Sequence, residues 1–332
     1  MKRAASTVLR RASNGRCAGD RRVIITGGSS GVGVALVAAL LQREGRGQIY
    51  VTGTRPFEDT QLCEMLRERS EDDAARVRYS VGDAGCTEAV AAQMADAVQF
   101  FDGSAPDALF LNAGIGGGRY QLEDLDVDRF DAIMRTNVRG VFLWLRAALP
   151  LLKKLEEPSQ IVVTSSVLGN RATTQAAAYC ASKFAVNGMV LSLRQDLRSA
   201  HPRIKVGLVC PAAIATPWWV RGRVRVRVRV RVSPNPNPNP NPNPNPTLTL
   251  TLTLTLTLTL PLTLTLTLTL TLTLTLTRWD EPGRSGAFKA TPKPTALLSA
   301  DAVAEACISL VEQPPSSNIE QLNLEAVEGS GV

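Results

Sequence analysis

Short runs of apolar residues alternate with longer segments of helical periodicity along the first two thirds of the chain. The runs end in small or polar residues, which is typical of buried strands. They predict strands at residues 22–26, 48–52, 76–81, 108–111, 161–164 and 205–209. Between them, apolar positions three and four apart predict helices at residues 34–42, 60–69, 87–101, around 130–142 and at 179–199. This alternation indicates an α/β fold with a doubly wound parallel sheet.

Composition and charge narrow the class of protein. The chain has 332 residues, of which 44% are hydrophobic and 20% are charged, enough to bury a core. The formal net charge is +7, but two segments account for it: six arginines in residues 221–231 and five cations in residues 1–19. The rest of the chain carries a net charge of −4. We therefore expect no nucleic-acid partner.

Cysteine and histidine usage argues against a metal site. The six cysteines show no CxxC pairing, and the single histidine, His201, lies in a turn before a predicted strand. This pattern favours a reducing compartment and no zinc. Residues 1–20 are read as a disordered tail or a transit peptide, since residues 1–19 are rich in Arg, Ala and Ser and lack acids. The expected location is the cytoplasm, or a mitochondrion or plastid if these residues are a transit peptide.

A glycine-rich segment links the first predicted strand to the first predicted helix. The strand ends at Thr26, and Gly27-Gly28-Ser29-Ser30-Gly31-Val32-Gly33 follows. Glycines at such a turn let the backbone approach a pyrophosphate, which then lies at the helix N-terminus. The spacing is not the strict G-x-G-x-x-G, so the position between strand and helix carries the argument. It predicts a Rossmann fold that binds a dinucleotide.

The residues after the second strand bear on the choice between NAD and NADP. An acid there would bind the ribose 2′-hydroxyl of NAD and repel a 2′-phosphate. The chain instead has Gly53-Thr54-Arg55, with one cation and no acid. This favours NADP, with NAD as the alternative, although Arg55 could equally be the start of a loop before Pro56.

A candidate for proton transfer follows the fifth predicted strand. Tyr179 and Lys183 are four apart and share a helix face, where a lysine ammonium would lower the pKa of the tyrosine. Ser166 lies thirteen residues before Tyr179, at the carboxyl end of a strand. Asn137 lies among apolar residues of a helix, either as a kink residue or as part of a water-holding relay. A lone Tyr-x-x-x-Lys pair also occurs on ordinary surface helices.

Together these motifs resemble the short-chain dehydrogenase/reductase family, in its compact single-domain form. The matching motifs fall in the family's order and spacing: Thr26 to Gly33, Asn112-Ala113-Gly114, Asn137, Ser166, Tyr179-x-x-x-Lys183 and Pro211 to Thr216. The resemblance covers about residues 22–220 and resumes at about 296–326. There, residues 299–304 look like the family's last helix and residues 319–324 its last strand.

The resemblance implies a set of catalytic roles. Tyr179 would donate a proton to a carbonyl oxygen or accept one from an alcohol, and Ser166 would polarise that oxygen. Lys183 would lower the pKa of Tyr179 and bind the nicotinamide ribose, while Asn137 would hold a water. The reaction would interconvert a carbonyl and a secondary alcohol of a small molecule, in a homodimer or homotetramer assembled through the long helices near 130–150 and 179–199.

The resemblance also implies the residues that contact the cofactor. The predicted set is Thr26, Gly27, Ser29, Gly31, Val32, Gly33, Arg55, Asp83, Asn112, Ala113, Gly114, Tyr179, Lys183, Pro211, Ile214 and Thr216. Asp83 is expected at the adenine. The chain departs from the family at Pro211-Ala212, where Pro-Gly is usual, and at Leu111-Asn112, where Asn-Asn is usual. Neither change removes a catalytic group.

Residues 221–277 form a low-complexity insert of dipeptide repeats. Arg-Val pairs are followed by Pro-Asn pairs and then by Thr-Leu pairs. GTT-AGG encodes Val-Arg, while its complement read in two frames, CCT-AAC and CTA-ACC, encodes Pro-Asn and Leu-Thr. All three repeats therefore follow from one telomere-like hexamer, TTAGGG, and we hypothesise that the insert is translated repeat DNA. The alternations also suit strands of period two.

The insert divides the expected domain and sets the alternatives. The expected reductase domain spans residues 21–220 and 278–326, with residues 327–332 as a tail. The insert falls in the family's substrate loop, so the sequence does not identify the substrate. The first reading is an NADP-preferring oxidoreductase. The alternative is a catalytically impaired nucleotide-binding product whose substrate lid the insert disrupts. A membrane anchor at residues 247–277 is rejected because threonine occupies every helical face.

Overall fold

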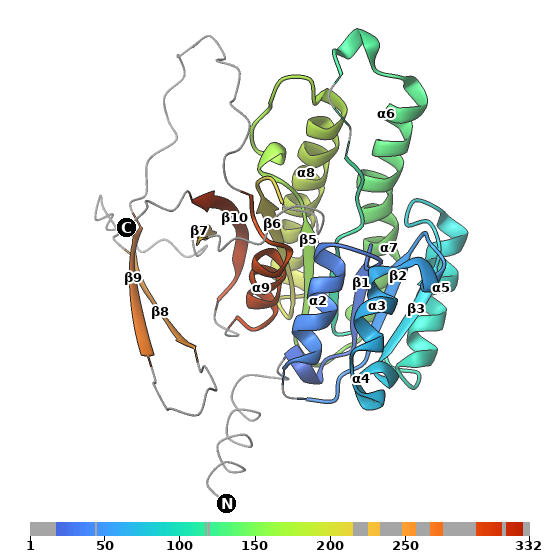
Figure 1. Cartoon of the computed structure of the whole chain (residues 1–332), viewed down its shortest axis with the longest axis vertical. Helices are drawn as coiled ribbons and strands as arrows, with labels where there is room; N and C mark the ends of the chain where they lie inside the picture. The colour runs from blue at the N-terminus through green and yellow to red at the C-terminus, as the bar shows by residue number, and fades with distance from the viewer. Residues whose placement is uncertain are drawn as a thin grey trace, which may run out of the picture. The chain divides into compact units, whose positions relative to one another are not determined.

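A computed structural model describes residues 18–43, 45–116, 118, 120–214, 225–232, 248–256, 266–274, 297–313 and 317–327 (Figure 1). By internal contacts the chain divides into two units, one of residues 1–233 and 290–332 and the other of residues 234–289. The first unit holds the sheet, the helices and the candidate site.

The sheet of the first unit has the strand order β3-β2-β1-β4-β5-β6-β10-β7. Every pairing from β3 to β10 is parallel, and β7 pairs antiparallel with β10. The order reverses between β1 and β4, as a doubly wound sheet requires. The strands are β1 (Val23–Thr26), β2 (Ile49–Gly53), β3 (Val77–Val81), β4 (Ala108–Leu111), β5 (Ser159–Thr164), β6 (Ile204–Pro211), β10 (Ile319–Val327) and β7 (Arg225–Val232).

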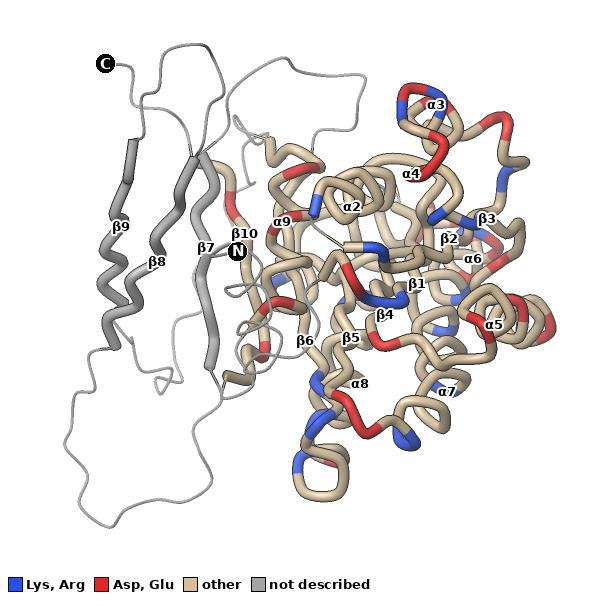
Figure 2. The backbone as a smooth tube through the Cα atoms, turned by 90° about the horizontal axis from the view of Figure 1, so that it is seen from below, with Lys and Arg blue, Asp and Glu red and all other residues tan. Residues whose placement is uncertain are grey.

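Helices cover both faces of this sheet. The longer ones are α2 (Val32–Leu41), α5 (Thr87–Phe100), α7 (Gly140–Leu152), α8 (Ala177–Ala200) and α9 (Ala300–Val311). Figure 2 shows α2 and α9 on one side of the sheet and α5, α7 and α8 on the other. Short elements complete the layers: α3 (Gln61–Arg67), α4 (Glu71–Ala75), α6 (Val127–Met134), a π-helical turn η4 (Arg135–Arg139), and the 3₁₀ turns η1 (Ala18–Asp20), η2 (Phe57–Asp59), η3 (Leu122–Asp124) and η5 (Val167–Gly169).

The central strands are apolar throughout because each face packs against helices. In β1, Val23 and Ile25 belong to the core beneath α2 and α9, whereas Ile24 belongs to the core beneath α7 and α8. Alternate side chains point to opposite faces of a strand, so a continuous apolar run suits a sheet covered on both sides. The predicted doubly wound α/β fold is confirmed.

The helix predicted at residues 60–69 forms as α3, which Thr60 caps by accepting the Cys63 N–H. The short helices on either side of it, η2 and α4, are additions to the predicted elements, and Ser70 caps α4 by accepting the Asp73 N–H. The helix expected around residues 130–142 runs through α6, the π-helical turn η4 and α7, and Asn137 lies in that turn. Single π turns inside helices frequently mark functional sites.

Two residues far apart in the sequence pair with each other after β6. Ile214, after β6, forms a parallel bridge with Leu298, whose backbone N–H donates to the Ala213 carbonyl at 2.9 Å. In the sequence, residues 215–297 lie between these two paired residues and include the repeats. Within this segment, the Arg-Val repeat contributes β7, and in the second unit the Thr-Leu repeat forms an antiparallel pair, β8 (Leu248–Leu256) and β9 (Leu266–Leu274).

Candidate active site

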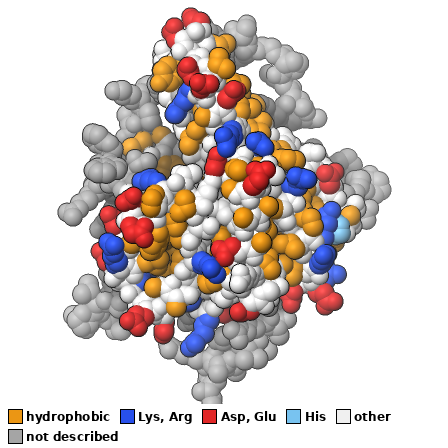
Figure 3. Space-filling model, turned by 90° about the vertical axis from the view of Figure 1, so that its right-hand side faces the viewer, with side chains coloured by type: hydrophobic (Ala, Val, Ile, Leu, Met, Phe, Trp, Pro, Cys, Tyr) orange, Lys and Arg blue, Asp and Glu red, His pale blue; other side chains and the backbone are white. Residues whose placement is uncertain are grey.

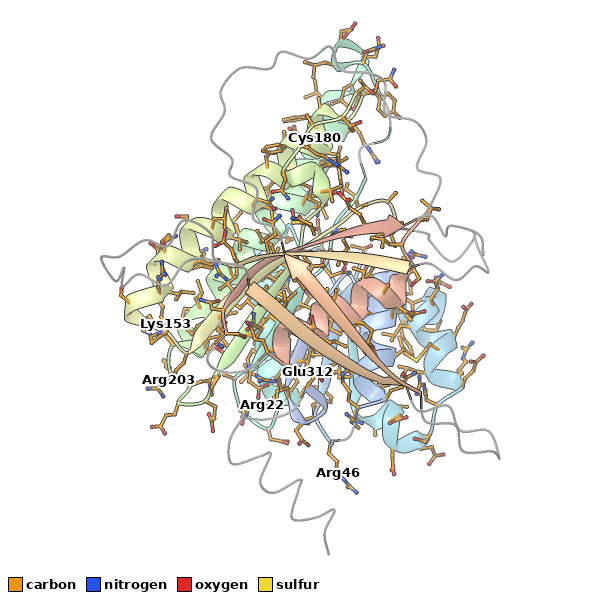
Figure 4. The ribbon with its side chains drawn as sticks, turned by 90° about the vertical axis from the view of Figure 1, so that its left-hand side faces the viewer. Arg22, Arg46, Lys153, Cys180, Arg203 and Glu312 are labelled. Atoms are coloured by element: carbon orange, nitrogen blue, oxygen red, sulfur yellow. The ribbon has the colours of Figure 1, made fainter. Side chains whose placement is uncertain are left out.

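Most of the predicted site residues lie in loops that follow parallel strands at one edge of the sheet, and Asn137, Tyr179 and Lys183 lie on helical segments. The strand register sets Thr26 beside Leu111, Leu111 beside Val163, and Thr164 beside Val209. The loops after β1, β4, β5 and β6 therefore start side by side. Ligands of open α/β sheets bind at this edge, next to the point where the strand order reverses. In Figure 4, Cys180, the neighbour of Tyr179, lies toward the top, whereas Arg22, Arg46 and Lys153 lie toward the opposite end.

The glycine-rich loop is fixed against the loop after β4. The Thr26 hydroxyl oxygen accepts the backbone N–H groups of Asn112 and Ala113, each at 3.0 Å, and the Asn112 amide donates to the Gly27 carbonyl at 3.2 Å. Gly27 has φ +67, and a Cβ there would lie 2.7 Å from the Ala113 Cα. Only glycine tolerates both the conformation and the contact. The structure thus brings together two predicted parts of the cofactor site.

The first helix starts directly from this loop. Gly31, the residue before α2, has φ 59, and no side chain caps the helix there. A Cβ on Gly33 would lie 2.4 Å from the Gly27 carbonyl oxygen, so the helix start and the end of β1 are in close contact. The first N–H groups of a helix have no intrahelical partner and favour an anion. Gly31, Val32 and Gly33 form this helix start, and the Gly31 N–H donates to the Gln61 Oε1 at 3.1 Å.

The four predicted catalytic residues converge at the end of β5. Ser166 follows the strand, and Tyr179 and Lys183 lie on the adjacent helix α8. The Lys183 Nζ donates to the Thr164 carbonyl at 3.0 Å and lies 5.7 Å from the centroid of the Tyr179 ring. A Cβ on Gly114 would lie 3.3 Å from the Asn137 Oδ1 and 3.7 Å from the Lys183 Nζ. The side chains of Asn137 and Lys183 therefore flank the loop after β4.

Asn137 is buried and uses its side chain to hold neighbouring loops. Its Nδ2 donates to the Ile115 carbonyl at 3.0 Å and to the Ser182 hydroxyl at 3.1 Å, and its Oδ1 accepts the Ile115 N–H at 2.8 Å. The Ser182 hydroxyl in turn donates to the Tyr179 carbonyl at 2.8 Å. A buried amide with these partners ties the loop after β4 to α8. The water-holding role of Asn137 stays a prediction.

Burial controls the protonation of the two central groups. It raises the pKa of Tyr179, and the hydrogen bond with Ser166 acts in the opposite direction. It lowers the pKa of Lys183 to about 8, because the ammonium is removed from water. The role of Lys183 in lowering the Tyr179 pKa stays a prediction. In this structure the Lys183 Nζ donates to the Thr164 carbonyl.

The remaining residues of the predicted cofactor site differ in their exposure and in their hydrogen-bond partners. The Arg55 side chain is exposed, while its carbonyl accepts the Tyr79 hydroxyl at 2.9 Å. Asp83 forms an ion pair with Arg135 at 2.8 Å and accepts the Gly85 N–H at 2.8 Å. The Pro211 carbonyl accepts the Ser166 hydroxyl at 3.4 Å. Thr216 lies outside the described residues.

Two residues near the site were not predicted as part of it. The Cys210 thiol is fully buried near Lys183, and burial raises its pKa to about 11. Asn187, one helical turn beyond Lys183, bonds to the turn that carries Ser166. The spacing 179, 183, 187 places Asn187 on the face shared by Tyr179 and Lys183, and that signal was available in the sequence.

The described parts of the chain contain no group of three or more His, Cys, Asp or Glu residues arranged to hold a metal ion. None of the helices in these parts combines the length and apolar character that a membrane crossing needs.

Comparison with known proteins places the chain in a family. A family model described as short chain dehydrogenase matches residues 21–223. The chain is 36% identical over 200 residues to 2-(R)-hydroxypropyl-CoM dehydrogenase of Xanthobacter autotrophicus, covering 60% of this chain and 76% of that protein. It is 36% identical over 192 residues to an A-factor type gamma-butyrolactone 1'-reductase of Streptomyces virginiae, covering 58% and 71%.

A solved structure shares this fold. It is a short-chain dehydrogenase/reductase from Burkholderia phymatum in complex with NAD, which is 27% identical and superposes with a TM-score of 0.54 over 60% of this chain and 69% of that one. The family match, the sequence relatives and the doubly wound sheet agree. The chain belongs to the short-chain dehydrogenase/reductase family of oxidoreductases.

Proposed function

We propose that this protein is an NADP-preferring oxidoreductase that interconverts a carbonyl and a secondary alcohol of a small molecule. The observation that carries the proposal is the convergence of Ser166, Tyr179 and Lys183 at the end of β5. A tyrosine hydroxyl within reach of a serine hydroxyl and beside a buried lysine is a suitable proton donor to an oxygen.

The residues present fit a dinucleotide. Glycine at positions 27 and 33 lets the loop pack directly against Ala113 and against the start of α2, and α2 starts without a side-chain cap. The loop after β4, which includes Ala113 and Gly114, would line the cofactor. When bound, the nicotinamide would supply or accept the hydride, and the protein would supply orientation and proton transfer.

Each catalytic residue has a separate task in this proposal. Tyr179 would protonate the carbonyl oxygen in reduction or take the hydroxyl proton in oxidation. Ser166 would donate a hydrogen bond to the same oxygen and hold it near Tyr179. Lys183 would bind the nicotinamide ribose, and Asn137 would hold a water that links Lys183 to solvent. The tight partnering of Lys183 and Asn137 favours preorganised roles, since such side chains do not need to reorganise during the reaction.

Arg55 carries the proposed preference for NADP. Its loop follows β2, and a Cβ on Gly53 would lie 3.0 Å from the Ser29 Cβ, so this loop adjoins the glycine-rich segment. We expect Arg55→Asp to shift the ratio of kcat/KM for NADPH over NADH toward NADH by about 10- to 100-fold, because an acid repels a 2′-phosphate. Steady-state kinetics with both cofactors measures the ratio, with Arg67→Asp as an exposed-charge control. An unchanged ratio would remove Arg55 from the site, and NAD would become the expected cofactor.

The insert favours a second candidate function. The insert follows Ile214, which comes after β6, and falls where the family has its substrate lid. A nucleotide-binding protein with a disrupted lid would keep the same glycine-rich loop. Two measurements on the full-length chain separate the candidates: NADPH binding by fluorescence, and NADPH oxidation with a panel of aldehydes and ketones. An active oxidoreductase should bind NADPH and oxidise it with a carbonyl substrate, whereas an impaired protein should only bind NADPH. Transcript sequencing across residues 219–278 shows whether the repeat is translated.

We further propose that the protein forms a homodimer or homotetramer through helices near the site. An apolar groove is lined by Met134, Val138, Phe142 and Met189, with Arg135 and Arg139 at its border. Phe142 and Phe184 are 49% and 46% exposed. Figure 3 shows hydrophobic side chains gathered between charged ones on the face that it presents. Exposed apolar groups of this size favour burial against a second copy.

Phe142→Glu is expected to convert the oligomer to a monomer, because it would place a carboxylate in an apolar interface without a partner. Light scattering coupled to size-exclusion chromatography measures the mass. Leu122→Glu, at a residue that is 69% exposed and outside the groove, serves as the control. A wild-type chain that is already monomeric, or a variant that keeps the oligomer, would contradict this interface.

A further inference from the structure

The turn that carries Ser166 is held by a buried amide that the catalytic roles above do not use. Asn187 lies on α8, four residues after Lys183, and is 5% exposed. Its Oδ1 accepts the Ser165 hydroxyl at 2.5 Å. Its Nδ2 donates to the Gly169 carbonyl and to the Asn170 Oδ1, each at 3.0 Å. All of these hydrogen bonds go to residues 165–170, so the Asn187 side chain holds this one turn.

These bonds bracket Ser166 in the sequence. One partner precedes Ser166 directly, and the other two follow it by three and four residues. Ser166 itself accepts the Leu168 N–H at 3.1 Å and starts η5, so its side chain moves with this turn. The position of the Ser166 hydroxyl relative to Tyr179 therefore depends on how the turn is attached to α8.

The packing of the turn shows that its attachment is close. A Cβ on Gly169 would lie 2.7 Å from the Asn187 Nδ2, 2.9 Å from the Lys183 carbonyl oxygen and 2.9 Å from the Ser165 Oγ. No other residue type fits at that distance without a shift of the turn. One turn of helix earlier, Lys183 bonds to the Thr164 carbonyl. Two successive turns of α8 thus form hydrogen bonds with the end of β5 and with the turn after it.

We propose that Asn187 is a positioning residue that sets the distance and direction of the Ser166 hydroxyl toward Tyr179. The inference rests on the proposed function and adds a residue to it. The bonds continue from Asn170 to Asn323 on β10 at 3.2 Å, so the last strand of the parallel sheet supports the same turn. Removing the amide leaves buried partners unsatisfied and frees the turn to move.

The test is a double-mutant cycle on the full-length chain. Asn187→Leu is expected to lower kcat by about 10²-fold, since small misplacements of a catalytic group cost this much. It should leave the Kd for NADPH unchanged, because none of the amide's bonds goes to the glycine-rich loop. In a Ser166→Ala chain the same substitution should change kcat little, because the group that Asn187 positions is already absent.

A matched control separates positioning from loss of stability. Val190 is also on α8 and fully buried, but it packs in the core away from the turn. Val190→Ala should lower the unfolding temperature, and it should change kcat by the same small factor in the wild-type chain and in the Ser166→Ala chain. If Asn187→Leu does not fold, Asn187→Asp replaces it, since it keeps the size and the bond from Ser165 but removes both donors.

A second measurement needs no turnover. The chain has four tyrosines, so tyrosine labelled with ¹³C at Cζ gives few signals, and Tyr179→Phe identifies the one from Tyr179. Asn187→Leu is expected to move that signal as Ser166→Ala does. If the wild-type chain shows no turnover but the signal moves, the proposed function fails and the positioning role stands. Equal losses of kcat in both backgrounds, or a Tyr179 signal that stays as in the wild type, would overturn the positioning role.

Discussion

Replacing Tyr179 with Phe is expected to lower kcat for carbonyl reduction by about 10³-fold while the Kd for NADPH stays within about a factor of two. The substitution removes one oxygen atom and keeps the ring. Tyr179 is partly buried beside Ser166 and Lys183, and its hydroxyl is the proposed donor to the carbonyl oxygen. Burial raises the pKa of this hydroxyl, which keeps it protonated and able to donate at neutral pH.

Stopped-flow or steady-state NADPH oxidation measures the loss, and fluorescence titration measures cofactor binding. Tyr120→Phe is the matched control, because Tyr120 is 48% exposed and lines a small cavity next to Tyr179. It should keep kcat within about threefold, since an exposed hydroxyl loses little on removal. A Tyr179→Phe chain with wild-type kcat would refute the assignment of the proton donor.

Replacing Lys183 with Met is expected to stabilise the cofactor-free protein at neutral pH and to lower kcat by at least about 10²-fold. Lys183 is 5% exposed, and burial lowers its pKa from 10.5 to about 8. At pH 7 the folded chain therefore holds a buried ammonium at a cost in free energy. After the lost bond to Thr164 is allowed for, the free energy of unfolding should rise by about 2 kcal/mol.

The pH dependence of this difference follows from the direction of the pKa change. Between the folded pKa of about 8 and the unfolded value of 10.5, the unfolded chain binds more protons at Lys183 than the folded chain. The wild-type protein therefore gains stability relative to Lys183→Met as the pH rises through this range. Urea denaturation of both chains at about pH 7 and about pH 9.5 measures the change. A difference that is the same at both pH values, or a variant with full turnover, would contradict the account.

Much of the fold follows from local sequence because both faces of the sheet are covered. Apolar runs such as Val23-Ile24-Ile25 suit strands covered on both faces, and the glycine-rich segment marks the turn between the first strand and the first helix. The short helix α4 was missed because its five residues are too few for a helical pattern and its start depends on one cap, Ser70. The π-helical turn at Asn137 has no sequence pattern, since it forms where the buried amide reaches Ile115 and Ser182.

The candidate site was predictable in its residues and less so in its electrostatics. Ser166, Tyr179 and Lys183 meet because a strand end and a helix face bring fixed spacings together. The protonation of Tyr179 depends on its burial and on where Lys183 points, and neither can be read from Tyr-x-x-x-Lys. The spacing places Asn187 on the helix face of Tyr179 and Lys183, but its hydrogen-bond partners cannot be read from the sequence because they lie in the turn after β5.

The central claim is that the full-length chain transfers hydride between a nicotinamide and a carbonyl carbon with Tyr179 as the proton donor. Reduction of a carbonyl panel with NADPH deuterated at carbon 4 tests this most directly, with mass spectrometry of the alcohol products. We expect one deuterium at the carbinol carbon of at least one product, and about 10³-fold slower labelling by the Tyr179→Phe chain. A chain that binds the labelled NADPH and delivers deuterium to no carbonyl would contradict the account and leave the impaired nucleotide-binding protein in its place.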